Sequence, residues 1–179
     1  MPHCTPELLV DGLGFPEGPR WRAGRLFFSD MVIRQVMSVD LQGDRQTVVA
    51  LSDIPSGIGW LPGGEMLVVS ETEMKVLRLT PEGLSTYADT GVVAPEIIND
   101  MVVDRQGRAY VGGWGGGVDE SKPIGGANFP DRSHLFLIEP GGAVRVVADA
   151  MISPNGMAIT PDGSTLIVAE TFACRLTAF

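Results

Sequence analysis

Short apolar segments separated by glycine-containing turns recur along the chain. Residues Val76–Thr80 alternate apolar and polar side chains with the two-residue period of a strand. The runs Met66–Val69 and Leu135–Ile138 are short and apolar, which favours buried strands. No long stretch shows the 3.6-residue apolar spacing of a helix. The pattern therefore predicts an all-β chain built from short strands.

The strand–turn–strand pattern repeats at regular intervals. Four segments share it, and they begin at Trp21, Trp60, Val103 and Ile159. Each has a glycine in its turn, where a positive φ is needed, and these glycines are Gly24, Gly64, Gly107 and Gly163. Their spacings are 40, 43 and 56 residues. A second series of turns follows at Gly43, Gly83 and Gly142, so each unit contains four strands.

A period near 40 residues with four strands per unit is typical of β-propeller blades. We expect a single propeller domain over residues 1–179, with blades that start near residues 17, 56, 99 and 155. The longest spacing predicts a loop insertion at about residues 112–134, over the channel mouth. A β-sandwich is the structural rival, but two regular series of turns favour the propeller.

The fourth unit ends at Phe179, one strand short of the other three. We therefore expect about three and three-quarter blades. One interpretation is a closed four-bladed ring in which Glu7–Val10 supplies the missing strand. The other is a truncated larger ring with open sheet edges.

Composition and charge restrict the classes of partner. The formal net charge of −9 and the pI near 4.6 argue against a nucleic-acid partner, which needs clustered Lys and Arg. Residues 1–10 show no signal-peptide pattern, and no apolar run approaches a membrane span, so we expect a cytoplasmic protein without a membrane partner. Cys4 and Cys174 are expected to be free thiols, with a disulfide as the alternative. The sequence does not indicate an oligomeric state.

One residue per blade forms a candidate ligand ring. Four residues before each repeat anchor stand oxygen-bearing side chains, which are Glu17, Ser56, Asn99 and Asn155. Each alone would be an ordinary turn or cap residue, but equivalent positions at the start of the innermost strands should converge on the channel. Carboxylate and amide oxygens suit a hard cation. With two histidines and no Cys pair, a conventional zinc site is not expected.

Three motifs carry a family resemblance: FPEGPRW, IINDMVVDRQGRAYVGG and SPNGMAITPDGSTLIVAET. With them the chain resembles, from about Glu7 to Phe179, the family of senescence marker protein, gluconolactonase and luciferin-regenerating enzyme. The resemblance implies a six-bladed propeller, truncated here, that holds one divalent cation and hydrolyses lactones or related esters. It implies Ca²⁺ first, with Zn²⁺, Mg²⁺ and Mn²⁺ as alternatives.

The same resemblance implies roles for individual residues. Glu17 and Asn155 would be metal ligands, Asn99 would contact the substrate or complete the coordination through a water, and Asp100 would shape the pocket. Trp114, in the insertion, could close over an apolar substrate, although packing that holds the loop down explains it equally well.

Two departures from the family pattern affect the expected activity. The family's further Asp ligand, its expected catalytic base, would lie beyond Phe179, so the catalytic residue is unassigned and impaired activity is expected of residues 1–179 alone. Some members have an Arg where this chain has Ile97, which argues against a sugar lactone as substrate.

The resulting hypothesis is metal-dependent hydrolysis of a small-molecule lactone or ester. The alternative from another class is a non-catalytic propeller that binds a small ligand or a protein on its channel face. A propeller similar to strictosidine synthase does not account for the ring. No GxSxG motif supports a serine hydrolase, and no Gly-Lys-Ser/Thr supports a phosphate-binding loop.

Overall fold

The computed structural model describes residues 5–115 and 132–179. Within these ranges the chain forms fifteen strands and no helix, which confirms the all-β prediction. The first sheet contains β1 (Pro16–Arg22), β2 (Arg25–Asp30), β3 (Gln35–Val39) and β4 (Arg45–Ala50). The second contains β5 (Pro55–Trp60), β6 (Met66–Ser70), β7 (Lys75–Thr80) and β8 (Gly83–Asp89). The third contains β9 (Ile98–Val103), β10 (Ala109–Gly113), β11 (Ser133–Ile138) and β12 (Val144–Met151). The fourth contains β13 (Pro154–Ile159), β14 (Leu166–Glu170) and β15 (Arg175–Ala178).

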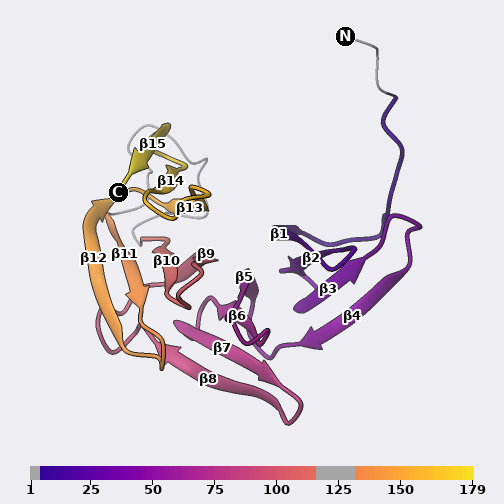
Figure 1. The fold of residues 1–179 in the computed structure, drawn as a ribbon, viewed down its shortest axis with the longest axis horizontal. Coiled ribbons are helices and arrows are strands. Elements are labelled where there is room, and N and C mark those ends of the chain that lie inside the picture. The colour runs from indigo at the N-terminus through magenta and orange to yellow at the C-terminus, as the bar shows by residue number, and fades with distance from the viewer. Residues whose placement is uncertain (1–4, 116–131) are drawn as a thin grey trace, which may run out of the picture.

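Each sheet is an antiparallel meander whose strands are ordered as in the sequence. The four sheets follow one another along an arc, with β1, β5, β9 and β13 on its inner side (Figure 1). Neighbouring inner strands contact one another, which sets the sheets face to face as propeller blades. The propeller prediction is confirmed, and the sandwich rival is wrong.

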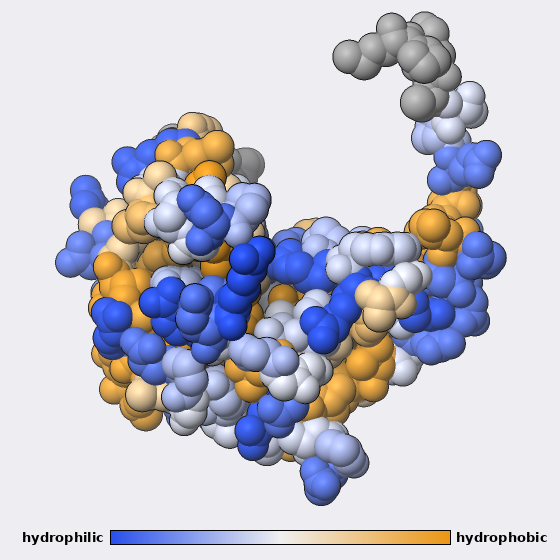
Figure 2. Space-filling view, viewed as in Figure 1, coloured by the Kyte–Doolittle hydropathy of each residue, from blue (hydrophilic) through white to orange (hydrophobic). Residues whose placement is uncertain are grey.

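The arc is open between the first and the fourth sheet (Figure 1). The N-terminal segment extends away from the arc, and Glu7–Val10 forms no strand. The interpretation in which that segment completes the fourth sheet is therefore wrong. The space-filling view shows the molecule hollowed on the same concave side (Figure 2).

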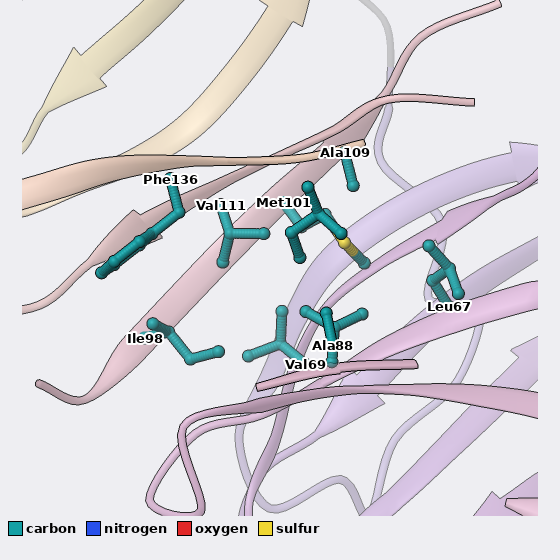
Figure 3. Close-up of a cluster of buried hydrophobic side chains, with 10 residues drawn as sticks. Leu67, Val69, Ala88, Ile98, Met101, Ala109, Val111 and Phe136 are labelled. Carbon is teal, nitrogen blue, oxygen red and sulfur yellow. The ribbon is translucent and has the colours of Figure 1, made fainter. Parts of the chain in front are cut away.

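Apolar side chains between adjacent sheets hold the blades together. The largest cluster lies between the second and third sheets, and Figure 3 shows its members Leu67, Val69, Ala88, Ile98, Met101, Ala109, Val111 and Phe136. Similar clusters join the first sheet to the second and the third sheet to the fourth. The two apolar runs of the sequence form most of β6 and β11 and are buried, as their composition predicts. Burial of these faces fixes the inner strands relative to one another.

The loop insertion and the two cysteines lie partly outside the described residues. The insertion separates β10 from β11, and its residues 116–131 lie outside the described ranges. Cys174 is exposed and free, whereas Cys4 is outside the described residues. The part of the chain that the structure describes holds no helix long and apolar enough to cross a membrane.

Candidate functional site

A cavity of about 460 Å³ on the inner side of the arc collects side chains from all four sheets. Its polar lining consists of Glu17, Glu71, Thr72, Asn99, Asn155 and Thr171. Its apolar lining consists of Phe15, Met31, Ile54, Ile97 and Trp114. Three of the four predicted ring residues are thus in one cavity, as the equivalence of their positions predicts.

Glu17, Asn99 and Asn155 reach the cavity because they stand at the same place in three inner strands. Each is the second residue of its strand, in β1, β9 and β13 respectively. Side chains at equivalent strand positions point to the same side of equivalent sheets. Because the sheets repeat, residues at the same offset in the sequence repeat bring their side chains to the same cavity.

Ser56, the fourth ring residue, does not line the cavity. Its side chain is fully buried, and its hydroxyl donates a hydrogen bond of 2.7 Å to Oδ1 of Asn99. The Ser29 hydroxyl in turn donates to the carbonyl of Ser56 at 2.5 Å. Ser56 therefore orients Asn99: because Oδ1 accepts the hydrogen bond from Ser56, Nδ2 is the group of Asn99 that is left to donate to a bound molecule.

Asp100 also lies outside the cavity lining. It is buried, its Oδ1 lies 3.1 Å from the Arg20 guanidinium, and it accepts the Met101 N–H at 2.7 Å. Burial raises the pKa of Asp100, and the positive charge of Arg20 partly offsets this. The contact joins β1 to β9, the strands that carry Glu17 and Asn99, so Asp100 helps to fix their spacing.

Trp114 lines the cavity and is also packed against Phe172, with ring centroids 5.5 Å apart in an edge-to-face contact. Its backbone N–H donates to the carbonyl of Ile97 at 2.7 Å. Both interpretations of this residue from the sequence are thus compatible with its position. It is anchored, and it presents an apolar wall to the cavity.

Glu71 is a cavity residue that reasoning from the sequence missed. Burial, together with the nearby carboxylates of Asp53 and Glu17, raises the pKa of Glu71 to about 7. Its position relative to the turn glycine could have indicated it: Glu71 follows Gly64 by seven residues, as Trp114 follows Gly107. Read singly, a carboxylate just after a strand looks like a solvated turn residue.

The charges in the cavity are all of one sign. Glu17 and Glu71 are its carboxylates, and none of the described residues that line it is Lys, Arg or His. Among the described residues no three His, Cys, Asp or Glu side chains form a metal cluster. The available donors are therefore carboxylate and amide oxygens, a set that suits a hard cation whose remaining positions are filled by water.

The raised pKa of Glu71 predicts a pH-dependent loss of stability in the cation-free protein. A carboxyl whose folded pKa lies above its unfolded value favours folding below the unfolded value of 4.5, and this contribution is lost as the pH rises through about 7. Glu71→Gln should remove this decrease in the free energy of unfolding. We expect the decrease to be only about 1 kcal/mol, because the side chain is partly exposed and solvent screens its interactions. Urea unfolding at pH 5 and pH 8, in chelator, measures it. An equal pH dependence in both proteins would contradict the assignment.

Residues 15–179 match the protein family described as SMP-30/Gluconolactonase/LRE-like region. No curated protein matches the sequence significantly. The match covers all four sheets and every residue that lines the cavity.

Solved structures of similar fold agree with this match. A gluconolactonase from Xanthomonas campestris has a TM-score of 0.76 and 24% identity, with 96% of this chain and 60% of that chain covered. A calcium-binding regucalcin from Agrobacterium tumefaciens has a TM-score of 0.73 and 18% identity over 95% and 55%. A luciferin-regenerating enzyme has a TM-score of 0.76 and 17% identity over 95% and 57%. At these identities the likeness is one of fold, and this chain spans about 60% of the gluconolactonase.

Proposed function

The chain belongs to the SMP-30/gluconolactonase/LRE-like family, and from that premise we propose that its inner cavity serves the metal-dependent hydrolysis of a lactone or related ester. The observation that carries the proposal is the meeting of Glu17, Asn99 and Asn155 in one cavity. Equivalent positions on the inner strands of three sheets would have no reason to share a polar pocket if each were a turn residue.

A divalent cation fits the residues present. Glu17 offers a carboxylate and Asn155 an amide oxygen, and both line a cavity in which two carboxylates face no positive side chain among the described residues. We propose Glu17 and Asn155 as the ligands that this chain supplies, with Ca²⁺ first and Zn²⁺, Mg²⁺ or Mn²⁺ as alternatives. When bound, such a cation supplies polarisation of the ester carbonyl.

The chain's own side chains would position the substrate. Asn99 has its Oδ1 held by Ser56, so its Nδ2 is oriented to donate a hydrogen bond to a lactone oxygen. Ser56 cannot reorient freely, because it is fully buried. A prepositioned donor of this kind stabilises negative charge that develops on the substrate oxygen.

Removal of the cation tests the proposal. We expect calorimetric titration of the chelator-treated chain with Ca²⁺ to give one site per chain, and the saturated chain to bind a lactone about tenfold more tightly than the cation-free chain, a difference of about 1.4 kcal/mol. Acid release that requires the cation would distinguish hydrolysis from binding alone. A chain that binds no divalent cation, or whose lactone affinity ignores it, would contradict the proposal.

A further inference from the structure

A second set of equivalent positions lies above the predicted ring. In each sheet, the backbone carbonyl of the residue just before the inner strand accepts a hydrogen bond from the backbone N–H of the residue just after the second strand. The four pairs, which we call the collar, are Phe15–Met31, Ile54–Glu71, Ile97–Trp114 and Ser153–Thr171. Their N–O distances are 3.0, 3.0, 2.7 and 3.1 Å. Seven of these eight residues line the cavity, and Ser153 is buried beside it.

The first residue of each collar pair lies two residues before a ring residue in the sequence. Phe15, Ile54 and Ile97 each come two residues before a ring position. Two residues of a strand span about 7 Å and return the side chain to the same face. A lactone whose carbonyl lies level with Glu17 and Asn99 would therefore place a ring substituent of a few carbons against the collar.

The collar is apolar over three of the four sheets. Its large apolar members are Phe15, Met31, Ile54, Ile97 and Trp114. Phe15 is 53% exposed and Ile97 is 41% exposed. Exposed apolar side chains that line a cavity together with polar ligand groups indicate a surface that binds an apolar part of a ligand.

Most polar groups at the same level already have partners. The Thr72 hydroxyl and its backbone N–H both donate to Asp53. The Ser153 hydroxyl donates to the backbone carbonyl of Trp114 at 3.1 Å. This leaves Glu71 and Thr171 as the collar side chains that can meet substrate hydroxyls. A polyhydroxylated lactone would bury hydroxyls against apolar walls without partners, which is unfavourable.

We propose that the collar selects lactones that carry an alkyl or aryl substituent over polyhydroxylated sugar lactones. The inference rests on the proposed function, because it assumes that a lactone occupies the cavity. The collar side chains on which the selectivity depends are apolar and take no part in holding the cation; they are Phe15, Met31, Ile54, Ile97 and Trp114. Each buried methylene contributes roughly fourfold in affinity, so a short alkyl chain lying on Ile97 and Trp114 outweighs the loss of hydroxyl contacts.

A matched pair of six-membered lactones tests the selectivity. δ-Decalactone, with its pentyl chain, and glucono-δ-lactone are titrated into the full chain with Ca²⁺ in excess. We expect δ-decalactone to bind at least about tenfold more tightly. Ile97→Arg should reduce that preference about tenfold, because it replaces the apolar wall with a charge. Val92→Arg is the control: Val92 is 79% exposed in the same connection between strands and does not line the cavity.

The outcomes separate the two proposals. Tighter binding of δ-decalactone that Ile97→Arg lowers and Val92→Arg leaves unchanged supports the collar. Equal or tighter binding of glucono-δ-lactone overturns the collar inference and leaves the proposed function standing. An alkyl preference that survives in Ile97→Arg and in the second variant Phe15→Ser also overturns it. Failure of both lactones to bind to a chain that is saturated with Ca²⁺ overturns the proposed function, and the inference with it.

Discussion

The Glu17→Gln variant should lose divalent-cation affinity about a hundredfold or more while the chain stays folded. Glutamine keeps the size of the side chain and removes its charge. In a cavity whose described lining contains no positive side chain, that charge and the carboxylate of Glu71 are what attract a cation. The side chain is half-buried at the start of β1 and forms no ion pair with the described residues, so the sheets should pack as before. Calorimetric titration with Ca²⁺ measures the loss.

The matched control for this variant is Glu65→Gln. It removes the same charge from a side chain that is 43% exposed and paired with Arg78, outside the cavity. We expect the affinity of Glu65→Gln to stay within about twofold of the parent chain, because exposed charges far from the site are screened. Cation affinity in Glu17→Gln as high as in Glu65→Gln would contradict the assigned ligand set.

The Gly57→Ala variant should be destabilised by about 3 kcal/mol or more. Gly57 lies in β5 where its backbone runs against β9, and a Cβ there would overlap the backbone nitrogen of Met101 and the backbone of Asp100. Relief would require the second and third sheets to separate, which would open the main apolar cluster between them. Gly57 also adjoins Ser56, so the same shift would disturb the hydrogen bond that orients Asn99.

Gly156→Ala provides the control at the equivalent position of the fourth sheet. Gly156 follows Asn155 as Gly57 follows Ser56, and a Cβ added there meets nothing within 4 Å. Its effect should stay within about 0.5 kcal/mol. Urea unfolding of the two variants compares them directly. Equal stability of Gly57→Ala and Gly156→Ala would show that the approach of β5 to β9 does not limit packing.

The repeat made the fold predictable from the sequence. Turn glycines such as Gly24 and Gly64 mark where each strand must reverse, and their spacing counts the strands in a unit. Once the unit is known, the two-residue period of a strand decides which side chains share a face. That is why Glu17, Asn99 and Asn155 could be grouped before any coordinates were known.

Contacts between sheets were not predictable in the same way. The position of Asp100 depends on Arg20, eighty residues earlier, and that of Ser56 depends on Asn99, which belongs to another blade. Sequence periodicity fixes orientation within a sheet, but the side-chain rotamer depends on what the next sheet presents. For Glu71, too, the raised pKa arises from burial and from the carboxylates of Asp53 and Glu17, which no local sequence pattern indicates.

In the proposed site, Glu17 and Asn155 hold one cation inside the cavity. A crystal structure of the chain grown with Ca²⁺, with data collected at a wavelength that gives a calcium anomalous signal, tests it most directly. We expect one strong peak in the cavity, about 2.3–2.6 Å from a Glu17 carboxylate oxygen and from Oδ1 of Asn155. A peak bound elsewhere, or the two side chains too far apart to share an ion, would contradict it.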